Sequence, residues 1–443
     1  MILRKRFTRE ERSWIMYDWA EAVFTTIMMA AIFPVFFVTV AGGEDSLGSA
    51  WWAIGISISR IILGIAAPVI GAIIAYRGYK KKLFVTFVSL GILATLLLAA
   101  THLYYDEYGA IQGNWLMLLI GYVFALLFRS AASFVYDSYL PDVTTKDRMD
   151  MVSTWGFGIG YIGGSTIPFV ASILIIMFGP QFGIGMITAV RISIIMTGLW
   201  WAFFSIPMIR DVHHKHEIDV PKSAFMKDAL SKIFSTGKKI AKNKILLTFL
   251  IAYFFYIDGV GTIIGMATAY GTELGLDVVS MLGALFVTQI VACPFSIFFG
   301  KLSKKVNSIN LIFVAICVYI VICIMGFIMG FGLETGAFGV DIAVIFFWAL
   351  AFMVGTVQGG IQAISRSTFA RLVPAENSGE YFGFFEIYGR FSTIIGPFLY
   401  ATILNITGRP SFSILSIIAI FLVGFSILLA NRRSLKGALE RSR

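Results

Sequence analysis

Long apolar stretches dominate the chain and predict helices that cross a membrane. A bilayer core needs about 20 apolar residues of helix, and residues 311–329 run that far without a charge. Six such segments precede a polar stretch in the middle of the chain and six follow it. They cover about 14–40, 50–75, 83–101, 115–140, 151–178, 185–209, 245–270, 278–300, 310–330, 341–372, 381–407 and 411–430. The pattern predicts an all-α integral membrane protein with about twelve transmembrane helices.

The composition agrees with this prediction. The 443 residues are 58% hydrophobic and 14% charged, whereas soluble domains carry about 25% charged residues. The net charge of +10 sits in short clusters between apolar segments, without a basic groove or basic helix, so we expect no nucleic-acid partner. The cysteines lie inside apolar segments, and three of the four histidines (His213, His214 and His216) lie in a polar loop where we expect them to be solvated. We therefore predict no metal and no cofactor.

The connections between segments differ in charge, which predicts the orientation. The connections on one side carry nearly all of the Lys and Arg, for example Lys80 to Lys82 and Lys301, Lys304 and Lys305. Those on the other side carry only Arg409 with several acidic residues. Because basic loops stay in the cytoplasm, we expect both termini there, in a bacterial cell membrane.

The polar middle divides the chain into four parts. We predict an N-terminal six-helix bundle over 1–210, a basic cytoplasmic loop over 211–244, a C-terminal six-helix bundle over 245–431 and a basic tail over 432–443. Residues 223–241 of the loop have amphipathic helical spacing and many lysines. We expect this helix to lie on the anionic inner leaflet of the lipid bilayer.

The two halves also resemble each other in sequence. SFVYDSYLPD at 133–142 aligns with RSTFARLVPA at 366–375, which places Pro141 opposite Pro374. Two six-helix halves joined by a cytoplasmic loop resemble the major facilitator superfamily, as does the basic turn that follows Gly71. That superfamily turn usually carries Asp where Ala75 stands, so we expect the cytoplasmic gate to be held differently here.

Four motifs resemble the vacuole effluxer branch of that superfamily. They are Tyr17-Asp18-Trp19-Ala20, GFGIGYIGG at 156–164, QGGIQAISRSTFARLVP at 358–374 and Tyr381-Phe382-Gly383-Phe384. The branch includes a fungal autophagy-associated vacuolar amino-acid exporter and bacterial relatives of unknown substrate. The resemblance implies the major facilitator fold, efflux, and a central cavity lined by helices one, four, seven and ten. This chain departs from the branch at Glu21 and Ala22, where Asn and Ser are usual.

Polar side chains inside the apolar segments are the candidates for function, since a charge at mid-membrane costs at least about 2.5 kcal/mol. Arg129, Ser133 and Asp137 form a stripe with a spacing of four residues, and Gln358, Gln362 and Arg366 form another. By the resemblance, both stripes face the cavity; the alternative is that they hydrogen-bond helices together. The predicted substrate-binding residues are Arg129, Ser133, Tyr253, Tyr256, Gln358, Gln362 and Arg366.

Two carboxylates are candidates for coupling to an ion. Asp258 lies near mid-membrane beside Gly259 and Gly261, where we expect the helix to bend or break, and Glu21 lies in the first helix. Two alternatives for Asp258 are a salt bridge to Arg129 or Arg60 in one state, and a permanently paired buried ion. We expect gating or structural roles for Asp18, Asp137, Arg60, Glu386 and Arg390. Glu386 and Arg390 should form an ion pair on one face of their helix. We expect Arg371 to snorkel or to cap its helix, and the glycines of 156–164 to serve helix packing.

These features predict a secondary transporter that works by alternating access, and not an enzyme. Facing charges suit a zwitterion such as an amino acid, with Arg129 or Arg366 on its carboxylate and Asp258 or Glu21 on its amine. No nucleotide-binding loop is present, so a proton or sodium gradient is the expected energy source. A lipid or amphiphile carrier of the same fold is the alternative, followed by a membrane receptor or enzyme. Nothing in the chain requires more than a monomer.

Overall fold

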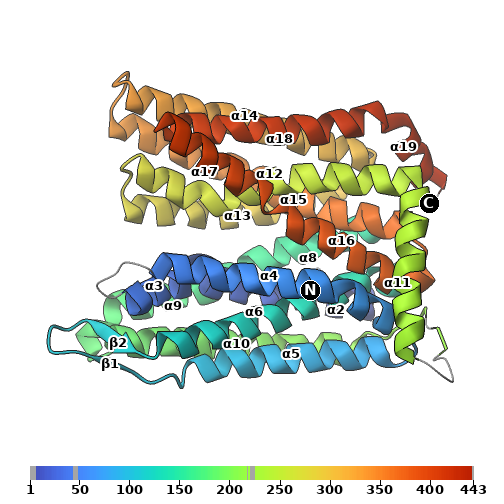
Figure 1. Ribbon diagram of the computed structural model, residues 1–443, viewed down its shortest axis with the longest axis horizontal. Coiled ribbons are helices and arrows are strands. Elements are labelled where there is room, and N and C mark those ends of the chain that lie inside the picture. The colour runs from blue at the N-terminus through green and yellow to red at the C-terminus, as the bar shows by residue number, and fades with distance from the viewer. Residues whose placement is uncertain (1–5, 43–47, 217, 220–224, 442–443) are drawn as a thin grey trace. The chain divides into compact units, whose positions relative to one another are not determined.

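The computed structural model describes residues 6–42, 48–216, 218–219 and 225–441 (Figure 1). Its contacts divide the chain into two compact units. The first comprises Met1–Val143 and Ile159–Leu230, and the second comprises Thr144–Gly158 and Ser231–Arg443. Within the described residues, eleven helices are long and apolar enough to cross a membrane. The all-α architecture expected from the sequence is therefore present.

The first unit contains the first six spans, apart from the start of the fifth. Its elements are α2 (Arg9–Phe24), η1 (Thr25–Ala31), α3 (Ile32–Gly42), α4 (Gly48–Ile74), α5 (Tyr79–Leu98), β1 (Leu103–Tyr105), β2 (Ile111–Gly113), α6 (Trp115–Ser138), α7 (Leu140–Val143), η2 (Gly160–Thr166), α9 (Ile167–Phe178), η3 (Gly179–Phe182) and α10 (Met186–Asp211). Helix α5 packs on α6, and α2 packs on α10. Thr8 begins α2 with a capping box, in which its hydroxyl and the Glu11 carboxylate each accept the other residue's backbone N–H.

The second unit contains the remaining spans. Its elements are α8 (Met149–Ile159), most of α11 (Phe225–Lys242), α12 (Lys244–Glu273), α13 (Val278–Leu302), α14 (Ser308–Glu334), α15 (Val340–Leu372), η4 (Ala375–Asn377), α16 (Ser378–Ser392), α17 (Ile395–Thr407), α18 (Pro410–Ala430) and α19 (Arg432–Arg441). Helix α13 packs on α15, and α12 packs on α18. The predicted amphipathic helix is α11, although Ser223 lies outside the described residues.

Two spans differ from the continuous helices that the sequence predicts. The eleventh is broken between Ser392 and Ile395 into α16 and α17, so neither piece alone has the length of a crossing. The fifth is divided between the units: α8 belongs to the second, and η2 with α9 belongs to the first. The sequence predicts instead a first bundle that holds all of residues 1–210. Buried polar contacts hold α8 in the second unit and are described below.

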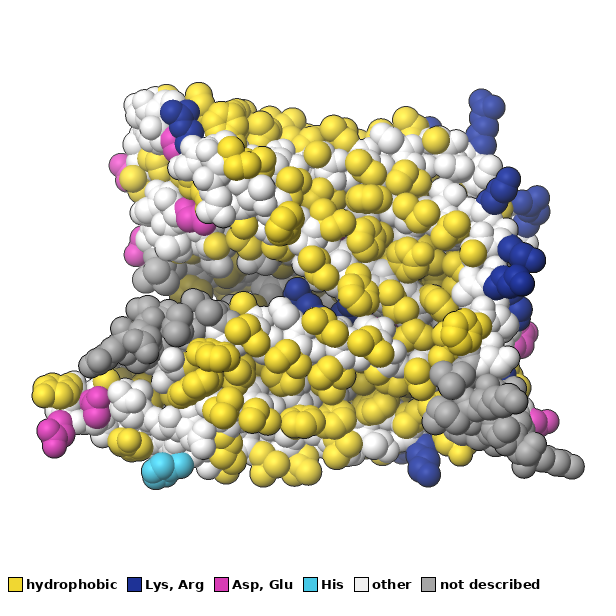
Figure 2. Space-filling view, viewed as in Figure 1, with side chains coloured by type: hydrophobic (Ala, Val, Ile, Leu, Met, Phe, Trp, Pro, Cys, Tyr) yellow, Lys and Arg dark blue, Asp and Glu magenta, His cyan; other side chains and the backbone are white. Residues whose placement is uncertain are grey.

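The surface of each unit is apolar along its flanks. Large side chains such as Ile65, Phe203 and Phe398 are 66–71% exposed, and yellow side chains cover the face shown in Figure 2. In the second unit, most of the visible Lys and Arg gather at one end of the helices, and Asp and Glu lie at the other end together with a basic group (Figure 2). Apolar flanks between polar ends are what a multi-pass membrane protein presents to lipid.

The start of the central loop is bound to the first unit rather than free in solvent. Ile218 pairs with Tyr76 in a β-bridge: its N–H donates to the carbonyl of Ala75 (3.0 Å), and its carbonyl accepts the N–H of Arg77 (2.8 Å). The turn that lacks the superfamily's usual Asp is thus held by main-chain bonds. We call residues 212–218 the loop strap; Glu217 within it lies outside the described residues.

Asp142 anchors this loop strap from the end of the fourth span. One carboxylate oxygen accepts the Lys80 ammonium (2.7 Å), and the other accepts the backbone N–H groups of Lys215 and His216. The His216 ring lies 2.9 Å from the same carboxylate, and the charges around Asp142 hold its pKa well below its usual range against the effect of burial. The expectation that His216 is solvated was therefore wrong, and His214 is half-buried.

Candidate functional site

A cluster of opposite charges joins the first and fourth spans inside the first unit. Arg129 Nη2 on α6 lies 3.4 Å from Glu21 Oε1 on α2 and donates to Thr25 Oγ1 over 2.9 Å. Ser133 Oγ donates to the same Glu21 oxygen over 3.1 Å. The side chains of Arg129 and Glu21 are 12% and 9% exposed. We call Glu21, Thr25, Arg129 and Ser133 the charged cluster.

The geometry of the two helices explains why these residues meet. Arg129 and Ser133 are four residues apart, so they lie on one face of α6. Thr25 follows Glu21 by four residues and begins the π-helical segment η1. A π-helical segment widens the backbone and occurs frequently at functional sites. The stripe predicted on the fourth span thus contributes two of its members to the charged cluster, and Asp137 is half-buried one turn further along.

Close glycine packing positions the first span beside this cluster. A Cβ on Gly163 would lie 1.8 Å from the ring of Trp19, and a Cβ on Gly160 would lie 3.1 Å from the Asp18 carbonyl. Trp19 in turn stacks on Trp200 of α10 with ring centroids 6.0 Å apart. The glycines of the fifth span therefore allow η2 to approach α2 closely, as the packing interpretation predicts. Asp18 itself is buried within α2.

One member of the stripe predicted on the tenth span, Arg366, bonds another helix of the second unit. Arg366 donates to the hydroxyl of Ser153 (2.9 Å) and to its carbonyl (3.2 Å), and its guanidinium lies 4.6 Å from the centre of the Phe157 ring. Arg366 is 4% exposed. Gln358 is buried and Gln362 half-buried on the same helix. For Arg366, the structure shows the interhelical hydrogen bonding that was the alternative to a cavity contact.

The two tyrosines predicted as substrate-binding residues of the seventh span, Tyr253 and Tyr256, lie on α12 and contact neighbouring helices. The hydroxyl groups of Tyr256 and Ser365 are 2.7 Å apart. Tyr253 stacks on Phe385 of α16 with ring centroids 4.3 Å apart. These contacts tie α12 to α15 and to α16, and the substrate-binding role of the tyrosines stays a prediction.

The sequence did not single out Asp150, which is the centre of a buried network. Its carboxylate accepts hydrogen bonds from the Arg371 guanidinium (2.8 Å), from the Ser308 hydroxyl (2.7 Å) and from the Ser367 hydroxyl. Arg371 is 3% exposed. The expectation that Arg371 snorkels to the surface or caps its helix was wrong, because Asp150 neutralises it inside the protein. These bonds hold α8 in the second unit.

Asp258 lies on a continuous helix, because α12 does not break at Gly259 and Gly261 as the sequence suggested. Phe421 occupies the space beside Gly259. The Asp258 carboxylate accepts the backbone N–H of Gly396 at the start of α17 (3.1 Å). The break that glycines predicted in the seventh span is found instead in the eleventh.

The remaining predicted charges are half-buried. Glu386 and Arg390 form the expected pair on α16, with Arg390 Nε donating to Glu386 Oε1 over 2.6 Å. Arg60 is half-buried on α4. Among the described residues, no three His, Cys, Asp or Glu side chains lie together in a way that could hold a metal ion.

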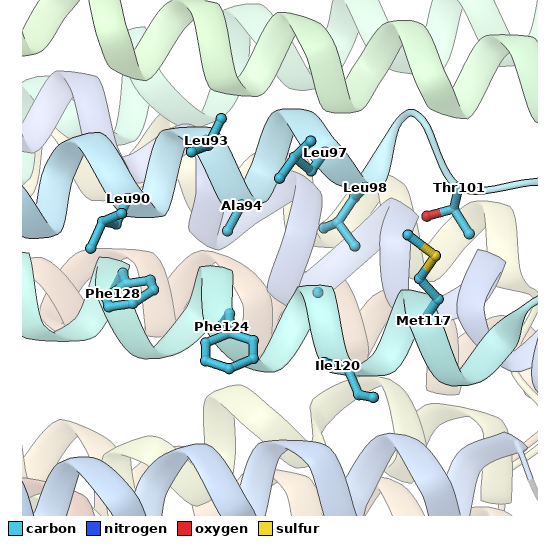
Figure 3. Close-up of a pocket in the computed structure, with 11 residues that line it drawn as sticks. Leu90, Leu93, Ala94, Leu97, Leu98, Thr101, Met117, Ile120, Phe124 and Phe128 are labelled. Atoms are coloured by element: carbon cyan, nitrogen blue, oxygen red, sulfur yellow. The ribbon is translucent and has the colours of Figure 1, made fainter.

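An apolar groove of about 320 Å³ runs between α5 and α6. Figure 3 shows the side chains that line it. They are Leu90, Leu93, Ala94, Leu97, Leu98, Thr101, Met117, Ile120, Gly121, Phe124 and Phe128. None of them is charged, and Leu93, Leu97 and Met117 are more than half exposed. Such a groove fits a hydrocarbon chain and not a zwitterion.

Comparison with known proteins identifies relatives of this chain. The family described as "Vacuole effluxer Atg22 like" matches residues 37–437. An uncharacterised MFS-type transporter of Bacillus subtilis, YxiO, is 40% identical over 431 residues, which cover 96% of this chain and 95% of that protein. Autophagy-related protein 22 of Botryotinia fuckeliana is 26% identical over 60% of this chain. This chain spans about half of that fungal protein, with 48% covered.

Solved structures show the same fold. The human organic anion transporter MFSD10 has a TM-score of 0.68 at 11% identity, covering 95% of this chain and 99% of that one. The proton:xylose symporter XylE has a TM-score of 0.66 at 11% identity, covering 95% and 94%. At these identities the likeness concerns the fold alone. The Bacillus relative is named as a transporter and the family as an effluxer, not as enzymes, in agreement with the sequence-based expectation.

Proposed function

Because this chain belongs to the Atg22-like vacuole effluxer family of major facilitator transporters, we propose that it exports an amino acid or a related zwitterion from the cytoplasm. It is a multi-pass membrane protein of the transporter class. The family description supports efflux, and the Bacillus relative supports a bacterial cell membrane. We further propose that both termini are cytoplasmic, since the basic connections lie on one side.

The charged cluster is the observation that carries the proposal. An amino acid brings one carboxylate and one ammonium group, and Arg129 and Glu21 offer one partner for each. Arg129 and Glu21 are 3.4 Å apart, longer than the roughly 2.7–2.9 Å of a tight charged hydrogen bond. A bound solute would insert between them, with its carboxylate on the Arg129 fork and its ammonium on Glu21. Ser133 and Thr25 would supply hydroxyls to the solute.

An ion gradient would drive the transport. No Gly-Lys-Ser/Thr phosphate loop occurs in the sequence, so the direct use of ATP has no recognisable site. Asp258 and Glu21 are the carboxylates that we propose for coupling, with protons or sodium as the ion.

The protein would act as a monomer whose α11 contacts anionic lipid. Thr236 hydrogen-bonds Glu380 of α16 and is fully buried, which docks α11 on the second unit. On the remaining surface of α11, Phe234 is 79% exposed and Lys238, Lys239 and Lys242 are exposed. An exposed aromatic ring with several lysines suits the headgroup region of an anionic leaflet.

An amphiphile carrier is the second candidate, and the apolar groove between α5 and α6 favours it. The groove would hold an acyl chain of the substrate. It contains no charged residue, and its exposed lining is also what ordinary lipid contact requires. The first candidate requires the charged cluster to bind an amino acid or a related zwitterion, whereas the second requires it to bind an amphiphile.

A thermal-shift screen of the purified protein separates these candidates, since a ligand that binds the folded state raises the melting temperature. Amino acids, dipeptides, sugars and lysolipids would be tested against wild type, Arg129→Ala and Arg191→Ala. Arg191 is a matched control, because it is a half-buried span arginine that donates to the Thr101 carbonyl. Stabilisation by amino acids that Arg129→Ala abolishes and Arg191→Ala keeps would support the proposal. Stabilisation by lysolipids alone would favour the amphiphile carrier.

A further inference from the structure

The break in the eleventh span exposes a helix N-terminus inside the second unit. Helix α16 ends at Ser392 and α17 begins at Ile395, so Gly396 is the second residue of α17. The first N–H groups of a helix have no partner within the helix, and they carry a partial positive charge. Such an end must be satisfied by another group when it is buried.

Asp258 of α12 satisfies it. Its Oδ1 accepts the Gly396 N–H over 3.1 Å, and Asp258 is fully buried. A Cβ built on Gly396 would lie 1.9 Å from Thr262 Oγ1 and 3.1 Å from Asp258 Oδ1. Only glycine therefore allows the start of α17 to approach these two side chains so closely.

Two oxygens beside this contact have no hydrogen-bond partner among the described residues. Asp258 Oδ2 and Thr262 Oγ1 are both buried and unpartnered within the described part of the chain. The two residues are one turn apart on α12, so their side chains lie on one face. A buried carboxylate without a counter-charge is costly in a membrane, and a bound cation removes that cost.

Several titratable groups on the neighbouring helices are paired with other residues. Arg366 and Arg371 of α15 bind Ser153 and Asp150, and Glu386 and Arg390 of α16 bind each other. Glu380 accepts from Thr236, Glu273 accepts from Tyr400 of α17, and Tyr256 bonds Ser365. Helix α18 has no charged residue. The remaining groups on the packed helices are Lys301 and Cys293 of α13, Asp341 of α15, Tyr381 and Tyr388 of α16, Lys244, Tyr253 and Tyr270 of α12, and Arg432, Arg433, Lys436, Glu440 and Arg441 of α19.

We propose that Asp258, Thr262 and Gly396 form a proton-binding site whose occupancy controls the docking of α17 on α12. The proton would bind Asp258 Oδ2, and the new O–H would donate to Thr262 Oγ1. The two unpartnered oxygens suit a proton better than Na⁺, which needs a larger shell of oxygen ligands. The inference rests on the proposed transport function and names the coupling site for it.

Protonation would weaken the hold on α17. An ionised Asp258 accepts the Gly396 N–H as a charge-assisted hydrogen bond and attracts the positive end of α17. A neutral carboxyl keeps neither advantage, so the start of α17 is released when the proton binds. Proton binding is thereby converted into movement of half of a span.

Infrared spectroscopy of the purified protein tests the proton site without any transported solute. Wild type should show the C=O stretch of a protonated carboxyl that disappears as the pH is raised. The band should be lost in Asp258→Asn, be shifted in Thr262→Val, and persist in Asp277→Asn, whose carboxylate caps α13 at an exposed position. Absence of the band at every pH, or its persistence in Asp258→Asn, would overturn the proposal. Removal of the band by NaCl at constant pH would also overturn it, in favour of a sodium site.

Hydrogen–deuterium exchange tests the link to α17. After correction for intrinsic exchange rates, the Gly396 amide should exchange about tenfold to hundredfold faster when the site is protonated, as expected for loss of a hydrogen bond to a charged group. Thr262→Val should move the pH of this change. Equal protection across the pH range would overturn the docking step. Neither experiment depends on amino-acid transport. A failure of the proton site can therefore be distinguished from a failure of the proposed transport function.

Discussion

Asp150 and Arg371 form an ion pair of 2.8 Å in which the two side chains are 5% and 2% exposed. The pair joins the start of the fifth span to the end of the tenth, and two serine hydroxyls complete the coordination of the carboxylate. Because α8 continues directly into η2 of the first unit, this ion pair lies at one end of the span that the two units share.

Removing Asp150 should strongly destabilise the second unit. Asp150→Ala leaves the Arg371 charge buried without its partner, which typically costs about 3–5 kcal/mol. The measurement is the free energy of unfolding in detergent. Asp147→Ala is the matched control, because Asp147 is an exposed aspartate in the connection before α8, and the substitution should cost about 0.5 kcal/mol or less. If the two substitutions lowered the free energy of unfolding equally, the buried ion pair would contribute no more to stability than an exposed aspartate.

Glycine packing beside Trp19 gives a second prediction. In Gly163→Ala the new methyl group would overlap the Trp19 ring, so the helices must move apart at a cost of about 1–3 kcal/mol. In Gly265→Ala the methyl group meets nothing within 4 Å, and the helix propensity of alanine should stabilise α12 by up to about 1 kcal/mol. Melting temperatures in detergent should therefore move in opposite directions. A similar fall in both variants would contradict the packing described for η2.

The loop strap gives a pH-dependent prediction. Burial, assisted by the positive charge of Lys80, lowers the pKa of His214 to about 4, below the roughly 6.5 of a free histidine. The unfolded strap therefore binds a proton below about pH 6.5 and the folded strap does not until about pH 4. The stabilisation is complete above pH 6.5 and is lost progressively down to about pH 4, by less than about 1.4 kcal/mol per pH unit because the ring is partly exposed.

Amide exchange of residues 212–216 at pH 7.5 and pH 5 measures this effect. Protection should fall at the lower pH in wild type and change little in His214→Gln. His213→Gln replaces an exposed neighbouring histidine and should behave like wild type. A pH dependence that survives in His214→Gln would show that another group controls the strap.

Much of the fold could be predicted because a bilayer imposes simple length and charge rules. Hydropathy located the spans, and helical spacing located α11, the Glu386–Arg390 pair, and the face shared by Arg129 and Ser133. These features depend only on residues close together in sequence, where periodicity carries the information.

The features that sequence reasoning missed depend on contacts between distant segments. Asp150 precedes the apolar stretch predicted from residue 151, so it was not counted among the charges inside the membrane. Asp142 was visible in the repeated motif, but its partners come from α5 and from the loop strap. The break after Ser392 precedes Pro397, which has no backbone N–H to donate to the Thr393 carbonyl. The start of α17 is also held by a carboxylate more than a hundred residues away.

Transport by the purified protein in liposomes tests the proposed function most directly. Liposomes that contain unlabelled alanine would be given labelled alanine outside, and its accumulation by exchange would be measured for wild type, Arg129→Ala, Glu21→Gln and Arg191→Ala. We predict accumulation by wild type and Arg191→Ala, and a loss of tenfold or more in the other two, since each removes a charged hydrogen bond to the solute. If a panel of amino acids that includes alanine gives no exchange in wild type, or if Arg129→Ala exchanges as fast as wild type, amino-acid transport through the charged cluster is contradicted.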